Sequence, residues 1–495
     1  MNYFKKDQRS KRTPLCLFLL AFVATFGLSS CEELWPLLDE LRPPGSDPGQ
    51  TTRYYVSPEG DDSNSGRTET APFASLQFAA DTLAPGDTLI LLEGTYNERV
   101  IVQRSGTAEN PLVIMTKPGD EAIIDGTGIE LSNFGYDGVF EVVAQRHVQL
   151  VGLRVENSGN VGIVIKGPNS SHIEVRDCYT NGTASSGIAA WGLSEEGTYD
   201  GISHLLIDNC EITDAMNSEE GFQECLTVAW GVEDFVVKNC HVHDVGYGSQ
   251  WGGPLGIDCK VGVRNGKVHD NLIHDIPNAS GLYVDAWDRL TYNIEYYNNR
   301  IYNCADAGLV IGSEAGGELQ NIRVYNNLIY NNNWDGIRLA QYYGEGTSYG
   351  PKDSIMIYNN VVHNNGLVNR GGIWDNDPYA TRVYIVNNIV SNNNGYQISL
   401  GYDEGAKPNH LVSHNLIDGF RGMFYSGEGY IVEEVMGDNA VEGDPLFVDA
   451  ANGDFSLQAG SPAIDAGNNN FVPPIDYDGE TRPKGEGVDI GADEY

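Results

Sequence analysis

The chain has 495 residues, with 69 Asp and Glu residues against 30 Lys and Arg residues and a formal net charge of −39 at pH 7. A chain this acidic offers no general phosphate-binding surface, so we expect no nucleic-acid partner. An anionic substrate would need local help, from a basic pocket or from a bound cation.

The first 30 residues predict an export signal. A basic start precedes a mostly apolar stretch at residues 14–27, which is too short for a comfortable membrane span. The segment Leu-Ser-Ser-Cys at residues 28–31 resembles a bacterial lipoprotein lipobox, and Glu32 and Glu33 are similar to the acidic export signals of Bacteroidetes surface lipoproteins. These resemblances imply lipidation of Cys31, with location at the cell outer membrane, surface-exposed or periplasm-facing, and membrane contact only through that anchor. A plain secretory signal is the alternative.

The segments after the signal predict a tether and then a cap. Residues 31–52 are rich in Pro and Gly, which is typical of a tether between an anchor and a folded body. Residues 54–81 predict a strand, a loop and a short helix with Ser75 as its N-cap. Because the end of a stack of strands exposes sheet edge and core, we expect a plug formed by Phe73, Leu76, Phe78 and Ala79.

A residue pair, most often Asn-Asn, recurs along the rest of the chain and is usually followed by two or three apolar residues. Its second member falls at residues 178, 210, 240, 271, 299, 327, 360, 388 and 415, in steps of 27 to 33 residues. A repeat of this length indicates one supersecondary unit stacked on itself. Each period holds short alternating runs of β type rather than a helical stripe. The pattern therefore predicts an all-β fold, a single-stranded right-handed parallel β-helix with an N-terminal helix cap and a C-terminal cap.

Stacking places the same position of neighbouring coils side by side, so we interpret the Asn repeat as a ladder of side-chain amides that satisfies turn backbone groups. We divide the body into an N-terminal cap with the first coils (53–140), the β-helix coils (141–430), and closing coils with a C-terminal cap (431–495). The cysteines of the body either pair as disulfides or form buried free thiols; they are Cys178, Cys210, Cys225, Cys240, Cys259 and Cys304.

Both ends of the body carry extended motifs. The N-terminal end reads Tyr-Tyr-Val-Ser-Pro-Glu-Gly-Asp-Asp-Ser-Asn-Ser-Gly at residues 54–66, and the C-terminal end reads Val-Asp-Ile-Gly-Ala-Asp-Glu-Tyr at residues 488–495. These motifs resemble secreted pectate-lyase-like β-helix proteins, and the resemblance covers roughly residues 53–495. It implies the fold rather than the reaction, since one solenoid serves lyases, hydrolases, epimerases and binding proteins.

Alignment of the coils on the Asn pair stacks one strand run from each coil. The runs lie at residues 162–166, 187–191, 225–229, 256–260, 281–285, 308–312, 336–340 and 372–376. The second and fourth residues of each run point inward, and the third and fifth point outward. The outward columns bring together Asp258, Lys260, Tyr283 and Asp285, flanked by Thr227, Arg338 and Trp191. Small outward residues predict a groove around this patch, at Ala229, Gly312 and Ala340.

The run Gly-Ile-Asp-Cys-Lys-Val-Gly at residues 256–262 is similar to the lysine-bearing strand of family-nine pectate lyases. The resemblance implies that Lys260 is the Brønsted base and that Asp258 and Asp285 hold Ca²⁺. That family uses a denser aspartate cluster than this sequence shows. A lysine base must be largely neutral, and bare aspartates beside it would raise its pKa unless a cation cancelled their charge. Tyr283 and Arg338 complete the candidate catalytic group.

These residues predict a Ca²⁺-assisted polysaccharide lyase that cleaves a uronate-containing glycan by β-elimination. The candidate substrate-binding residues are Trp191, Thr227, Trp287 and Trp374. One alternative is a glycoside hydrolase in which Asp258 and Asp285 act with Glu224, Asp335 or Asp375. The other alternative is a non-catalytic glycan-binding or adhesion lipoprotein. In each case we expect a monomer with a polysaccharide as its partner.

Two His-Asp pairs, His243-Asp244 and His274-Asp275, fall at one coil position. Tyr302, Tyr330 and His363 occupy the same position in later coils. We interpret this column as a stacked surface ladder rather than a metal or catalytic site.

Overall fold

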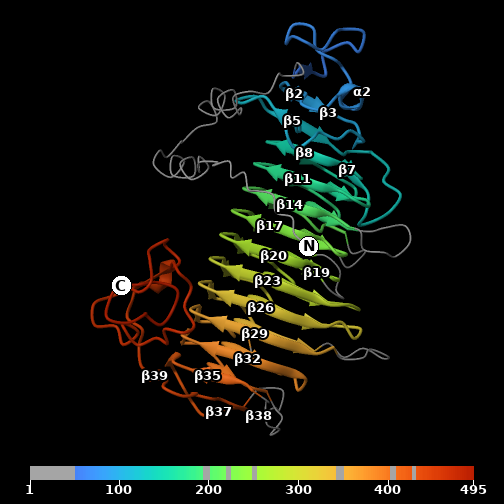
Figure 1. Ribbon diagram of the computed structural model, residues 1–495. Helices are drawn as coiled ribbons and strands as arrows, with labels where there is room; N and C mark the ends of the chain where they lie inside the picture. Colours follow the sequence, from blue (N-terminus) through green and yellow to red (C-terminus); the bar gives the residue numbers. More distant parts are fainter. Residues whose placement is uncertain are drawn as a thin grey trace, which may run out of the picture. The chain divides into compact units, whose positions relative to one another are not determined.

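The computed structural model describes residues 51–192, 201–218, 224–247, 253–341, 350–368, 370–401, 409–425 and 431–495 (Figure 1). The predicted signal peptide, the lipidation site Cys31 and almost all of the tether lie outside the described residues. Over the described ranges, residues 51–117 and 121–495 form one compact unit. Within the described ranges no helix combines the length and the apolar character that a membrane span requires.

The described chain forms three parallel sheets, and successive strands of the chain enter the three sheets in turn (Figure 1). Sheet A has 13 strands in the described ranges: β1 (Arg53–Val56), β2 (Thr88–Leu91), β5 (Leu112–Thr116), β8 (Arg146–Val151), β11 (Ser171–Arg176), β14 (Ser203–Asp208), β17 (Glu233–Lys238), β20 (Arg264–His269), β23 (Thr291–Tyr297), β26 (Leu319–Tyr325), β29 (Lys352–Tyr358), β32 (Ala380–Val386) and β35 (Leu411–Ser413).

Sheet B, counted over the same described residues, also has 13 strands: β3 (Gly94–Tyr96), β6 (Ala122–Asp125), β9 (Arg154–Glu156), β12 (Tyr179–Asn181), β15 (Glu211–Thr213), β18 (His241–His243), β21 (Leu272–His274), β24 (Arg300–Tyr302), β27 (Leu328–Tyr330), β30 (Val361–His363), β33 (Ile389–Ser391), β36 (Leu416–Asp418) and β39 (Val441–Glu442).

Sheet C has 11 strands in the part of the chain that is described: β4 (Val100–Val102), β7 (Gly138–Val143), β10 (Val161–Lys166), β13 (Ile188–Trp191), β16 (Leu226–Ala229), β19 (Ile257–Lys260), β22 (Leu282–Ala286), β25 (Leu309–Ser313), β28 (Ile337–Gln341), β31 (Ile373–Asp375) and β34 (Ile398–Ser399). The predicted all-β parallel solenoid is confirmed.

The core consists of aliphatic side chains that stack from coil to coil. On β14, Leu205 and Ile207 are buried in the core. The next strand of sheet A places Phe235 and Val237 directly beside them in parallel register. This alternation is what a strand with one buried face requires, because successive side chains point to opposite sides of the sheet.

The recurring Asn pair meets two separate demands at the turn between sheets A and B. The first member has a left-handed backbone, with φ of 53° at Asn298 and 52° at Asn326, which Asn tolerates better than most residues. The second member is buried, and its amide links the coils. Asn299 Nδ2 donates to Asn327 Oδ1 over 3.0 Å, and Asn327 Nδ2 donates to Asn360 Oδ1 over 2.9 Å. The predicted Asn ladder is confirmed.

All six cysteines of the described body are buried free thiols, so the free-thiol alternative is correct: Cys178, Cys210, Cys225, Cys240, Cys259 and Cys304. Three of them occupy the ladder position in the earlier coils, where they replace the Asn. Cys240 Sγ lies 3.2 Å from the carbonyl oxygen of Lys238. The backbone N–H of Cys240 donates to Asn271 Oδ1 over 2.9 Å, so the Asn ladder begins where the cysteine stack ends.

The N-terminal end carries the short helix α2 (Leu76–Thr82), as predicted. Leu76 and Ala79 are fully buried and Phe73 nearly so, but Phe78 is 42% exposed, so its placement in the plug was wrong. Ser75 occupies the N-cap position without capping the helix through its side chain. Instead the carboxylate of Glu98 accepts the N–H groups of Leu76 and Gln77, over 2.6 and 3.0 Å.

The C-terminal residues leave the coils and pack along their side. A short antiparallel pair, β37 (Met423–Tyr425) with β38 (Ile431–Glu433), follows the last long strand. A second pair, β40 (Phe447–Asp449) with β41 (Asp454–Leu457), flanks the 3₁₀ turn η2 (Ala450–Asn452). Apolar residues of this segment bury the outward side chains of β27, β30, β33 and β36, in a cluster of Leu328, Tyr330, Val361, Ile389, Leu416, Phe455, Leu457, Ala463, Ile490 and Ala492. Residues 443–495 therefore cover the outer face of sheet B over β27, β30, β33 and β36.

The ladder makes a specific prediction for Asn327→Ala. The truncation leaves the buried N–H of Asn299 and both ladder neighbours without their partner, so the free energy of unfolding should fall by about 3 kcal/mol. Urea unfolding followed by circular dichroism measures the change. Asn303→Gly is the matched control, since Asn303 is exposed, has φ of 55° and bonds only the neighbouring coil's Asp275 through its amide. An equal loss in both variants would contradict the role of the buried ladder.

Candidate functional site

The predicted register of sheet C is confirmed around the candidate patch. Asp258 pairs with Thr227 on one side and with Tyr283 on the other. Lys260 pairs with Asp285 in the same ladder. Since Cys259 and Val284 of these strands lie in the core, the acidic and basic side chains between them lie together on the outer face.

Five charged side chains form one group on this face, which we call the lysine–carboxylate cluster: Glu224, Asp258, Lys260, Asp285 and Glu314. Lys260 Nζ makes a close ion pair with Glu224 Oε1 and lies 3.6 Å from Asp258 Oδ2. Thr227 Oγ1 donates to the other oxygen of Glu224 over 3.0 Å. Tyr283 OH donates to Glu314 Oε1 over 3.0 Å. The cluster thus carries four carboxylates against one ammonium.

Two oxygens of the cluster have no hydrogen-bond partner among the described residues. They are Oδ1 of Asp258 and Oδ1 of Asp285, on neighbouring strands. The two residues are only 1% and 3% exposed, so water does not solvate these oxygens freely. Buried polar atoms are nearly always bonded, and a buried carboxylate is stable only when it is paired or binds a metal. A bound cation would satisfy this pair of oxygens; without one, burial favours the protonated carboxyls.

The pKa values of the cluster reflect its excess of negative charge. Burial, followed by the carboxylate of Glu224, raises the pKa of Asp258 well above its usual range. Burial, followed by Glu314, does the same to the pKa of Asp285. Burial alone would lower the pKa of Lys260, but Glu224 and Asp258 outweigh it and the net pKa is raised. With these carboxylates ionised Lys260 is protonated, the opposite of what a Brønsted base requires.

The carboxylates of the cluster are the kind of ligand that a hard divalent cation prefers, although among the described residues no three of them bring oxygens within 4.8 Å of one another. Ca²⁺ takes six to eight oxygen ligands, largely from carboxylates. Such oxygens come from four carboxylates on consecutive coils: Glu224, Asp258, Asp285 and Glu314. The sequence predicted only two of these, Asp258 and Asp285, as metal ligands. Glu314 was missed because it follows the end of β25. It lies two residues beyond Gly312, the outward neighbour of Asp285, so extending the outward column past the strand end is the signal that finds it.

The predicted groove over the small outward residues is wrong, because neighbouring side chains fill it. A Cβ at Gly312 would lie 2.3 Å from Tyr283 OH, so the tyrosine already occupies the space above the glycine. Ala340 packs with Tyr283 and Val310, and Ala229 is buried in the cluster around Trp191. The outer face of sheet C is therefore covered on both sides of the lysine–carboxylate cluster.

Three of the four predicted substrate-binding residues are buried. Trp191 packs against Tyr136 at a centroid distance of 5.1 Å, and Trp374 lies under the guanidinium of Arg370 at 4.5 Å. Thr227 is fully buried and orients Glu224. Trp287, 48% exposed, is the one of the four with a ring face open to a sugar. The prediction of Trp191 and Trp374 as exposed sugar platforms is corrected accordingly.

Arg338 belongs to a separate charged group. Its guanidinium donates to both carboxylate oxygens of Asp306, over 3.0 and 2.5 Å, and lies 3.7 Å from Asp335. Val310 stands between it and Tyr283 in the column, so Arg338 does not join the lysine–carboxylate cluster. Burial raises the pKa of Asp335 to about 6, although Arg338 and the hydroxyl of Tyr396 oppose this.

Asp375 also lies apart from the cluster. Its Oδ2 is 2.9 Å from His410 Nε2, and Asp377 beside it pairs with the fully buried Lys352. The structure therefore groups only Glu224, of the three further hydrolase candidates, with Asp258 and Asp285.

Comparisons with known proteins agree with the fold. A family described as "Pel9A-like, right handed beta helix region" matches residues 54–243, and one described as "Right handed beta helix region" matches residues 194–350. The chain is 27% identical over 467 residues to the uncharacterized protein YwoF of Bacillus subtilis, covering 84% of this chain and 92% of that protein.

A curated pectate lyase is also similar over part of its length. Pectate lyase PEL9 of Emericella nidulans is 30% identical over 130 residues, which are 24% of this chain and 31% of that enzyme, so the chain spans about a third of it. Among solved structures, the complex of XylC with xylose superposes with a TM-score of 0.58 at 12% identity, over 89% of this chain and 98% of that one. Fold and family matches together show a right-handed parallel β-helix that is similar, over residues 54–243, to the Pel9A-like proteins.

Proposed function

We propose that the protein acts on polysaccharide as a Ca²⁺-assisted lyase, which cleaves a uronate-containing glycan by β-elimination at the lysine–carboxylate cluster. The observation that carries the proposal is the pair of buried, unpartnered oxygens on Asp258 and Asp285, next to a lysine. The match to the Pel9A-like family ends at residue 243, before Lys260, so the assignment of the cluster rests on its geometry.

The reaction requires removal of the proton beside a uronate carboxylate. Ca²⁺ held at the cluster would supply positive charge that stabilises the negative charge developing on that carboxylate. Glu224, Asp258, Asp285 and Glu314 are the residues that would hold the cation. Their negative charges are also what keeps Lys260 protonated, so neutralising them lowers the pKa of the amine toward the range in which it accepts a proton.

The positions of the supporting residues fit this assignment. Thr227 fixes one oxygen of Glu224, which leaves the other on the Lys260 amine. Tyr283 fixes one oxygen of Glu314. Lys260, with 16% of its side chain exposed, and the partly exposed Glu314 are the members of the cluster that reach solvent, where a polymer would approach. A local cation also explains how a chain with net charge −39 would retain an anionic glycan.

Substitution of Lys260 tests the base. Both Lys260→Ala and Lys260→Arg should lower the rate of β-elimination by about 10²- to 10⁴-fold, since arginine keeps the charge but does not deprotonate. Lys166→Ala is the matched control: Lys166 stands in the same outward column and pairs with Asp137 at 3.0 Å and Glu141 at 2.8 Å. It should leave the rate unchanged. Near-normal activity of Lys260→Arg would show that the lysine serves only as a cation.

A product screen separates the three candidate functions. Pectate, other uronate polymers and neutral glycans are incubated with the protein, with and without a chelator. A lyase gives unsaturated products that absorb in the near ultraviolet, loses this activity with the chelator and regains it with Ca²⁺. Saturated products that persist in the chelator would instead indicate a two-carboxylate hydrolase, and binding without products would indicate a glycan-binding protein. Either result would overturn the proposal.

Asp285→Asn tests whether the excess negative charge of the lysine–carboxylate cluster lowers the melting temperature of the protein. A carboxyl whose pKa is raised by folding keeps its proton in the folded chain at pH values where the unfolded chain has lost it, so its cost to stability is absent below about pH 4, grows as the pH rises toward the raised pKa, and is constant above it. In chelator at pH 7 the variant should therefore melt at a higher temperature than the wild type, and the two should converge at low pH. Ca²⁺ should raise the melting temperature of the wild type more than that of the variant.

The exposed Asp288→Asn serves as the control for this experiment, because Asp288 pairs with Arg289 at the surface just after β22. It should show neither effect. A wild type and an Asp285→Asn variant with the same melting temperature at every pH would remove the electrostatic argument for a cation site.

A further inference from the structure

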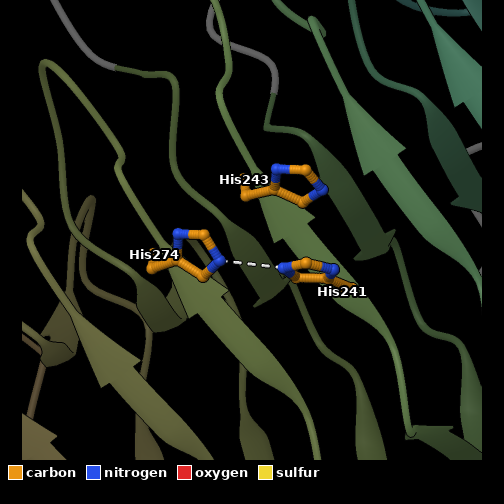
Figure 2. A group of neighbouring side chains, drawn as sticks. All are labelled: His241, His243 and His274. Atoms are coloured by element: carbon orange, nitrogen blue, oxygen red, sulfur yellow. Dashed lines mark hydrogen bonds between the residues drawn. The ribbon is translucent and has the colours of Figure 1, made fainter. Parts of the chain in front are cut away.

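A second cluster of ligating side chains lies on sheet B, in a different sheet from the lysine–carboxylate cluster. His241 and His243 on β18 and His274 on β21 gather their rings over neighbouring strands (Figure 2). Each ring offers a nitrogen, and these nitrogens all lie within 4.8 Å of one another. The Nε2 atoms of His241 and His274 are 2.8 Å apart (Figure 2).

Carboxylates fix the orientation of two of these rings. His243 Nδ1 lies 2.8 Å from Asp244 Oδ2, and His274 Nδ1 lies 2.6 Å from Asp275 Oδ2. A carboxylate at Nδ1 holds the ring proton there, so that Nε2 carries the lone pair with which a histidine can bind a metal. This is the arrangement that metal-bound histidines use in proteins.

A carboxylate oxygen lies beside His243, next to the three nitrogens that converge within 4.8 Å. Glu211 on β15 pairs with His241 in the strand register, and its Oε1 lies 3.3 Å from His243 Nε2. Two ligands of a tetrahedral zinc ion, at bonds of 2.0–2.1 Å, lie about 3.4 Å apart. The separations in the cluster, from 2.8 Å upward, bracket this value, so small ring rotations suffice. About 15% and 13% of the His243 and His274 side chains remain exposed, which gives an ion access.

Stacking alone explains a different histidine group of this chain but not this one. His147, His172 and His204 occupy one position in successive strands of sheet A, with ring centroids 4.5 and 4.4 Å apart. That column has one ring per coil, and its contact between His204 and Asp234 spans 4.0 Å. In the sheet B cluster two histidines come from a single strand, and the rings of His243 and His274 each have a carboxylate within 2.8 Å. Beyond it, His274, Tyr302 and Tyr330 do form the predicted ladder, with centroids 4.7 and 5.0 Å apart.

We propose that His241, His243 and His274, together with Glu211, bind one divalent transition-metal ion of the zinc type through their Nε2 atoms and a carboxylate oxygen. Imidazole ligands select such ions, whereas Ca²⁺ prefers oxygen, so this site and the lysine–carboxylate cluster take different metals. The ligands belong to β15, β18 and β21, so the bound ion joins three consecutive coils. This proposal departs from the interpretation of His243 and His274 as a surface ladder rather than a metal site.

The test uses the folded chain after removal of metals by a chelator. Co²⁺, which reports its ligands through visible absorption, should bind with one equivalent per chain, and Zn²⁺ should displace it while Ca²⁺ does not. The double variant His241→Ala/His274→Ala should lose the spectrum. Asp275→Asn should weaken binding by about 10- to 100-fold, because it removes the carboxylate that orients His274. His172→Ala, in the stacked column of sheet A, is the control and should bind normally.

Thermal unfolding gives a second measurement that is independent of any catalytic activity. Zn²⁺ should raise the melting temperature of the wild type and of His172→Ala, but not that of the double variant. The absence of saturable Co²⁺ binding in the wild type would overturn the proposal. So would undiminished binding in the double variant, or a near-ultraviolet thiolate band, which would assign the ion to cysteine.

Discussion

The in-register parallel pairing of successive coils is the constraint on which the rest of this structure depends. Because side chains alternate between two faces, a slip of one residue would turn every core side chain outward and every charged side chain inward. The buried Asn ladder opposes such a slip, since Asn299 and Asn327 bond only when their coils are aligned. Lys260 meets Asp285, and His241 lies beside Glu211, through the same register.

The two charged regions of the coils use this register in different ways. On sheet C, Asp258 and Asp285 are held out of water without enough positive charge nearby, an arrangement that costs stability and persists only where other contacts fix the strands. On sheet B, the histidines and Asp244 and Asp275 lie near the surface, where water reduces the cost of desolvating them. The charged group on sheet C therefore lowers the stability of the folded chain, whereas the histidine group on sheet B costs little stability.

The sequence predicted the features that follow from the repeat, such as strand register. It did not predict which outward side chains are buried by other side chains packed over the sheet. The step between Asn pairs was enough to place Asp258, Lys260, Tyr283 and Asp285 together, because strands in register repeat their geometry. The burial of Trp191 and Trp374 followed from side chains packed over the sheet, which no strand pattern encodes. Glu314 lies beyond a strand end, where the pattern stops. Phe78 was misplaced because it follows the buried Leu76 by two residues, and side chains two apart on a helix point to nearly opposite sides.

The buried cysteine stack makes local opening of the β-helix measurable by thiol labelling. Cys178, Cys210 and Cys240 lie at one position of three successive turns, each buried and none in a disulfide. A thiol of this kind reacts with a reagent only while its layer is transiently open, so its labelling rate reports the local opening free energy. The chain thus carries three evenly spaced natural reporters along its axis, without any engineered probe.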